Sequence, residues 1–121
     1  MLRRQTSQFQ PDLALLRPRP DFYAGRHPEP ADAFERAVAV AADADAAVVV
    51  VGLDNHWETE GRDRDSLALP GRQVELVRAV VAAQPRTVVC VVAGSPVDLS
   101  WAAEVPALLW CWLPGQEGGR A

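Results

Sequence analysis

Acidic and basic side chains follow directly after a run of valines near the middle of the chain. The run at 48–51 is too apolar for a surface strand, and at Gly52 it changes into a polar segment. The ionisable residues of that segment are Asp54, His56, Glu58, Glu60, Arg62, Asp63 and Arg64. If the valines form a buried strand, these side chains lie at the edge of a sheet, where they could transfer protons to or from a bound molecule.

Glu58 and Glu60 are the candidates for such a proton donor. A carboxyl group donates a proton near neutral pH only if its charged form is disfavoured, which neighbouring carboxylates or an aromatic ring such as Trp57 can achieve. The arginines of the same segment favour the charged form and act in the opposite direction. The residues alone therefore leave two interpretations: an acid/base site, or a solvated loop whose charges pair with one another.

Helices and strands alternate along the chain and would hold this loop in place. Asp32 can cap a helix, with Glu35 three residues later and apolar residues at helical spacing up to about residue 43. The continuous β-branched run at 46–51 is typical of a strand that is covered on both faces. We predict next a helix over 70–84 stopped by Pro85, a strand over 87–93, a turn at 94–96, a short helical segment over 99–103 and a strand over 107–113.

This order predicts an α/β domain. Apolar strands that alternate with helices form a mainly parallel sheet with right-handed crossovers, and here three such strands indicate a three-layer αβα sandwich. The connection over 52–69 has about 17 residues, whereas strand-to-helix loops in such folds usually have roughly 2 to 6. Because it contains a Trp and alternating charges rather than Gly and Ser, we interpret it as functional.

Composition excludes several classes of partner. A chain of 121 residues with a net charge of -4 gives no electrostatic reason to expect nucleic acid or an anionic membrane surface as a partner. No apolar run approaches the roughly 18 residues of a membrane span, and no signal-peptide core is present, so a cytoplasmic location is predicted. Residues 1–29 are rich in Pro and Arg and are predicted to form an extended, poorly ordered lead-in to a domain at 30–121.

Metal and nucleotide sites are not expected. Cys90 and Cys111 each lie in an apolar stretch, which predicts buried thiols that pack as small hydrophobic groups. His56 has no partner at ligand spacing, so no metal and no cofactor is predicted. The segment 115–119 has neither the glycine order of a dinucleotide site nor the Lys of a phosphate-binding loop.

Four blocks of the sequence resemble one known family. They read VVVVGLDNHWETEGRDR, LALPGRQVELVRAV, PRTVVCVVAGSPVDLSW and VPALLWCWLPGQEGG. In this order and spacing they resemble the C-terminal α/β sandwich domain of family 3 glycoside hydrolases, the β-glucosidase family, over about 30–121. WETEGRDR with LALPG is most similar to members in which a sugar-binding PA14 module is inserted before this segment.

The resemblance implies a role for each candidate residue. Family 3 enzymes use a retaining mechanism with an aspartate nucleophile on an N-terminal barrel and a glutamate acid/base on a loop of this domain. The W-E-S/T-E-G pattern implies that Glu60 is the acid/base, with Glu58 as the fallback. Asp63 and Arg64 match the family's D-R pair and are interpreted as shaping the loop. Trp57 could stack on a sugar ring or pin the loop to the domain.

The resemblance also implies partners that this chain lacks. The substrate would be a β-linked glucoside or oligosaccharide, and the barrel domain with the nucleophile would have to come from elsewhere. Nothing in the chain matches that barrel, so we expect a fragment that is inactive alone, because covalent catalysis needs both carboxylates. We also expect marginal stability, or association through apolar surface left uncovered by a three-stranded sheet. The alternatives are a non-catalytic α/β domain that binds sugar or a partner protein, and a nucleotide-binding domain.

Overall fold

The computed structural model describes residues 30–118, so the predicted lead-in at 1–29 lies outside the described residues. Residues 31–118 belong to a compact unit that begins at Ala31. The elements are α1 (Ala33–Ala42), β1 (Ala47–Gly52), α2 (Gln73–Ala83), β2 (Thr87–Val92), the 3-10 helix η2 (Ala102–Glu104), β3 (Leu108–Trp110) and the 3-10 helix η3 (Gly115–Glu117). The described part of the chain has no helix long and apolar enough to cross a membrane.

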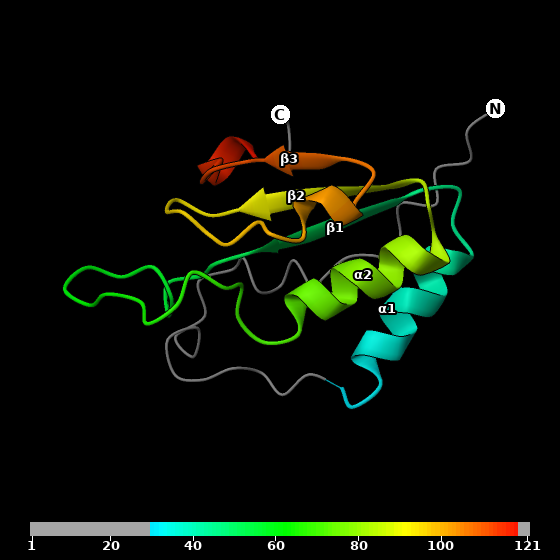
Figure 1. Ribbon diagram of the computed structural model, residues 1–121, viewed down its shortest axis with the longest axis horizontal. Coiled ribbons are helices and arrows are strands. Elements are labelled where there is room, and N and C mark those ends of the chain that lie inside the picture. Colours follow the sequence, from blue (N-terminus) through cyan, green and yellow to red (C-terminus); the bar gives the residue numbers. More distant parts are fainter. Residues whose placement is uncertain (1–29, 119–121) are drawn as a thin grey trace. The chain divides into compact units, whose positions relative to one another are not determined.

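The strands form one parallel sheet in the order β1-β2-β3, which confirms the predicted α/β class (Figure 1). Val50 is paired with Cys90, and Cys90 with Leu109. Because the strands lie in chain order, the connections through α2 and η2 both advance in the same direction across the sheet. Right-handed crossovers that advance in the same direction lie on the same face.

The α2 helix packs on β1 and β2, and α1 packs beside α2, so both α-helices lie on one face of the sheet (Figure 1). Val49 and Val51 point into this helix side and are 6% and 4% exposed, whereas Val48 and Val50 are 58% and 63% exposed. The uninterrupted valine run predicts cover on both faces. Within 30–118 the helices cover only one, so the second helix layer of the predicted sandwich is not found in this part of the chain.

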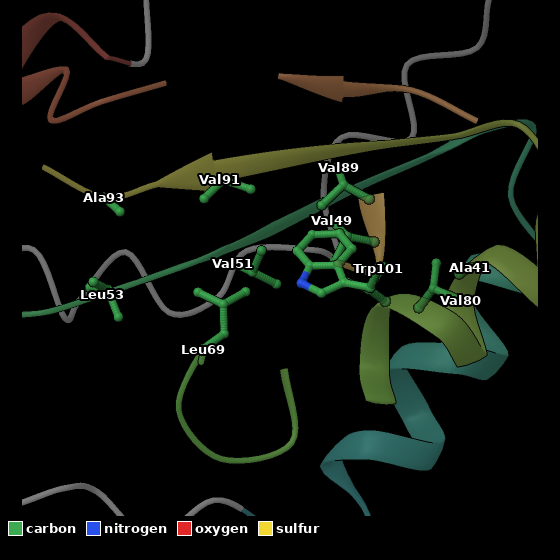
Figure 2. Packing of buried hydrophobic residues seen from close by; sticks show 11 residues of the cluster. Ala41, Val49, Val51, Leu53, Leu69, Val80, Val89, Val91, Ala93 and Trp101 are labelled. Atoms are coloured by element: carbon green, nitrogen blue, oxygen red, sulfur yellow. The ribbon is translucent and has the colours of Figure 1, made fainter. Parts of the chain in front are cut away.

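The core lies between the sheet and the helices, as Figure 2 shows. Val77, Val89 and Val91 are fully buried, and the ring of Trp101 fills the space between the strand valines and α2. Trp101 is held by its indole N–H, which donates to the Asp98 carbonyl at 3.1 Å. Burying this ring fixes the segment between β2 and β3 against the sheet.

Turn residues set the ends of the helices. Asp32 occupies the N-cap of α1, but its side chain makes no capping hydrogen bond. The predicted start of the next helix at Pro70 is early, because Gly71 has a φ of +62° and α2 begins only at Gln73. Its predicted end is confirmed: Gln84 is extended and precedes Pro85.

The third strand is shorter than predicted because of Trp112. This residue has a φ of +54°, which ends the strand after Trp110. Trp110 and Trp112 therefore do not alternate along one strand; their rings meet edge to face, with centroids 5.7 Å apart.

Candidate active site

The loop over residues 53–72 leaves the carboxyl end of β1, and the 94–96 turn leaves β2 at the same edge of the sheet (Figure 1). At Gly52 a Cβ atom would lie 1.9 Å from the carbonyl oxygen of Val92, so only glycine fits. The Gln73 side chain accepts from Gly52 N at 2.7 Å and donates to Gly52 O at 3.0 Å. The first residue of α2 is thus joined to the end of β1, and the loop is closed at its base.

Asp54 folds the first part of the 53–72 loop. Its Oδ1 accepts from the His56 N–H at 2.9 Å, and its carbonyl accepts from the N–H groups of Trp57 and Glu58, each at 2.9 Å. Such a turn is typical of Asp, whose short side chain bonds its own following backbone. It brings Trp57 back against the hydrophobic core, where the ring is half-buried.

The Glu58 carboxylate is bound by the 94–96 turn. Oε1 accepts from the Ser95 N–H at 2.6 Å and from the Ser95 hydroxyl at 2.5 Å, and Oε2 accepts from the Gly94 N–H at 3.1 Å. Burial raises the pKa of Glu58, but these hydrogen bonds and the Arg64 charge together lower it below its ordinary value of 4.5. Glu58 is therefore ionised at neutral pH, with its oxygens occupied.

Glu60 lies two residues further along, at the next turn of the loop. Its side chain is exposed, and among residues 30–118 no hydrogen bond or ion pair engages its carboxylate. Gly61 follows with a φ of +77° and has no atom within 4 Å of a Cβ position. This carboxyl group is accessible to a molecule that approaches the loop from outside.

Arg64 holds the far side of the same segment. Its Nη2 donates to the Pro96 carbonyl at 2.5 Å, and the residue is half-buried. Asp63 is exposed, and within 30–118 no ion pair joins it to Arg64. Of the two residues interpreted as shaping the loop, Arg64 contacts the 94–96 turn directly.

An open hollow of about 640 Å³ lies between the loop and the turn. Four of the residues to which the resemblance gives a role line it together, Trp57, Glu58, Asp63 and Arg64. Glu60 does not line it. Arg62, Ser95 and Leu113 complete much of the wall, which therefore combines apolar and charged groups.

The residues that bind Glu58 were not identified from the sequence. The sequence predicts Gly94 and Ser95 only as part of a turn. It likewise predicts Gln73, which binds Gly52, only as part of a helix. Parallel pairing of neighbouring strands was the available signal, because it brings the segments after β1 and β2 to one edge. Which side chain meets which backbone group depends on the register and could not be read from the sequence.

The remaining candidates lie apart from this site. Cys90 and Cys111 are half-buried rather than fully buried, and burial together with Cys111 raises the pKa of the Cys90 thiol. His56 is exposed, and no three potential metal ligands gather within the described residues. Gly115, with a φ of +60°, begins a tight turn in which Gly118 N–H donates to its carbonyl at 3.3 Å.

The parallel sheet and the charged loop at its carboxyl edge define an α/β domain with a candidate site of the kind found beyond strand ends. The profile of the Glycosyl hydrolase family 3 C-terminal domain matches residues 2–121. The chain belongs to this family.

Curated relatives are β-glucosidases. The Beta-glucosidase of Kluyveromyces marxianus is 47% identical over 85 residues, which cover 70% of this chain and 10% of that protein. The Probable beta-glucosidase J of Emericella nidulans is 45% identical over 88 residues, 73% of this chain and 10% of the relative. The chain thus spans about a tenth of the length of the relatives that it matches.

Solved structures show the same fold. The K. marxianus β-glucosidase in complex with glucose has a TM-score of 0.70 and 40% identity, covering 78% of this chain and 12% of that one. The Bifidobacterium adolescentis GH3 β-glucosidase has a TM-score of 0.71 and 37% identity, covering 79% of this chain and 14% of that one. These matches confirm the family that the four sequence blocks indicated.

Proposed function

We propose that this chain supplies the acid/base glutamate of a retaining β-glucosidase, and that Glu60 is this residue. In a retaining mechanism a carboxylic acid protonates the departing glycosidic oxygen, and its carboxylate then activates the water that hydrolyses the glycosyl-enzyme intermediate. The β-glucosidase names of the relatives favour a β-linked glucoside or oligosaccharide as the substrate.

The contrast between the two glutamates carries this assignment. Glu58 holds three hydrogen bonds from Gly94 and Ser95, and its lowered pKa disfavours the protonated form that a general acid needs. Glu60 is exposed beside it, at a turn of the loop. Of the two carboxyl groups, Glu60 is the one that can reach a sugar bound outside this domain.

The nucleophile has to come from a second domain. Retaining glycosidases place their two carboxyl groups about 5 to 5.5 Å apart across the scissile bond. The proposed partner is a family 3 barrel with its aspartate, and Glu60 reaches toward it from the carboxyl edge of the sheet. Without that aspartate no glycosyl-enzyme forms, so negligible hydrolysis by this chain alone is part of the proposal.

The neighbouring residues receive supporting roles. Trp57 packs on the core as well as lining the hollow, which favours pinning the loop over stacking on a sugar. Arg64 shapes the loop through Pro96. The segments WETEGRDR and LALPG further lead us to propose that the parent protein belongs to the PA14-containing subgroup. Separately, we propose that the parent protein is cytoplasmic. The upstream coding sequence would test both proposals, because it would show the other modules and any export signal.

Reconstitution tests the proposed function. The chain is mixed with a separately expressed family 3 barrel domain, and hydrolysis of an aryl β-glucoside is compared with the same mixture carrying Glu60→Gln. We expect activity that needs both pieces and falls by about two to four orders of magnitude in the variant. Full activity of Glu60→Gln in an active mixture contradicts the assignment.

A chimera removes any dependence on association. Residues 31–118 replace the matching segment of the K. marxianus β-glucosidase, with and without Glu60→Gln. If the chimera folds and binds glucose but is inactive with Glu60 intact, the alternative, a non-catalytic domain that binds sugar or a partner protein, becomes the better account.

A further inference from the structure

The segment that carries Glu60 is tied down on both sides. Glu58 precedes it by two residues and binds Gly94 and Ser95, and Arg64 follows it and binds Pro96. Both attachments are to the 94–96 turn, which begins two residues after the last residue of β2, Val92. Residues 59–63 therefore lie between two residues, Glu58 and Arg64, that are both hydrogen-bonded to the 94–96 turn.

The Glu58 attachment is the stronger of the two in chemical terms. Both attachments are charge-assisted, but the Glu58 carboxylate accepts three such hydrogen bonds, whereas the Arg64 guanidinium donates one to the Pro96 carbonyl. Two residues of extended chain span at most about 7 Å, so fixing Glu58 also restricts where the Glu60 backbone can lie. Removing the attachment would free a long stretch of the loop.

We propose that Glu58 is a positioning residue, whose carboxylate latches the loop to Gly94 and Ser95 and so holds Glu60 at the place where it can transfer a proton. This inference rests on the proposed role of Glu60. It assigns to the first glutamate of the W-E-T-E-G segment a function distinct from acid/base catalysis. It also makes Ser95, which supplies two of the three donors, part of the support.

The latch is first tested in this chain by NMR-detected hydrogen exchange. Glu58→Gln replaces one acceptor oxygen by an NH₂ group, which the N–H donors of the 94–96 turn repel. We expect the amides of Gly94 and Ser95 to exchange about tenfold faster or more, and the amide signals of Glu60 and Gly61 to shift. The core amides of Val89 and Val91 should be unchanged, and Glu60→Gln is the matched control that leaves Gly94 and Ser95 protected.

The pH dependence of the Gly94 and Ser95 amide signals distinguishes a contact that needs the charge of Glu58 from simple packing. Within the described residues, Arg64 is the charged group that acts on Glu58, and the 94–96 turn presents only neutral donors to it. In the wild type the Gly94 and Ser95 amide shifts should follow one titration with a midpoint below 4.5, and in Glu58→Gln this step should be absent. Identical exchange and identical profiles in the two proteins would overturn the inference.

Activity in the reconstituted mixture or the chimera then distinguishes the two glutamates. A mispositioned acid should lower kcat by about 10- to 100-fold with little change in KM. Glu60→Gln should lose most activity on substrates with poor leaving groups, which need protonation. If Glu60→Gln has no effect on activity, the proposed function fails. The exchange data would then still test whether Glu58 holds the loop to Gly94 and Ser95. If Glu60→Gln is inactive and Glu58→Gln is normal in kcat and exchange, the latch alone fails.

Discussion

At Gly52 the backbones of β1 and β2 approach so closely that a single methyl group cannot be accommodated. An added Cβ would lie 1.9 Å from the Val92 carbonyl oxygen, and neither atom belongs to a flexible side chain. We expect Gly52→Ala to lower the free energy of unfolding by about 3 kcal/mol. Urea denaturation measures this change.

Gly71→Ala is the matched control. Gly71 has a φ of +62° but no atom within 4 Å of a Cβ position, so only backbone strain of about 1 kcal/mol is expected. Equal losses in the two variants would show that strain rather than the close approach determines the effect at Gly52.

The pKa of Glu58 predicts a pH-dependent contribution to stability. Because the folded-state pKa is lowered below 4.5, the folded state favours the ionised form. The contribution is therefore fully present above about pH 4.5 and is lost as the pH falls through the lower folded-state pKa. We expect the difference in unfolding free energy between wild type and Glu58→Gln to be largest near pH 7 and to shrink in acid.

Measuring a difference between two proteins isolates Glu58 from other acids. The pKa of Glu104 is also lowered, by its hydrogen bond and charge interaction with Arg78, but that change is common to both proteins and cancels. A difference that stays constant from pH 7 to pH 3 would contradict a charge-dependent contact.

At the scale of elements, Gln84 joins the end of α1 to the turn before β2. Its buried side chain donates to the Ala44 carbonyl at 2.5 Å and accepts from the Arg86 N–H at 3.0 Å. Gln84→Ala leaves these backbone groups without their partner, so we expect a loss of about 2 kcal/mol in thermal or urea unfolding. The exposed Gln116→Ala should change stability by less than about 0.5 kcal/mol, and a similar loss in both would exclude Gln84 as a specific link.

At the scale of the whole molecule, the two faces of the sheet differ in cover. Val51 is 4% exposed and Val50, its neighbour in β1, is 63% exposed. Val51→Ala should lower the free energy of unfolding by about 2 kcal/mol, through lost burial and a cavity. Val50→Ala should cost about 0.5 kcal/mol or less.

This pair of variants reports on what covers the second face. Equal losses from Val50→Ala and Val51→Ala in this chain would show that the exposed face is packed in solution. The marginal stability and the association expected from the sequence remain predictions, and the total free energy of unfolding and sedimentation at several concentrations would test them.

The sequence by itself determined the class of fold and the family. Runs such as 48–51 and 87–92 indicated strands, and their alternation with amphipathic segments predicted a parallel sheet because chain order and handedness leave few arrangements. The four motif blocks indicated family 3, and they singled out the loop that carries Glu58 and Glu60. These properties depend on local composition and order, which are written directly in the chain.

The tertiary structure decided which of those residues meet. Gly94 and Ser95 donate hydrogen bonds to Glu58, and Pro96 accepts one from Arg64. The strand order also puts both crossovers on one face of the sheet. The tertiary structure also ended β3 at Trp110, where the sequence predicted a longer strand. Contacts between segments more than thirty residues apart depend on strand register, on the path of the loops and on the resulting hydrogen-bond geometry. The different environments of the two glutamates therefore became visible only in three dimensions.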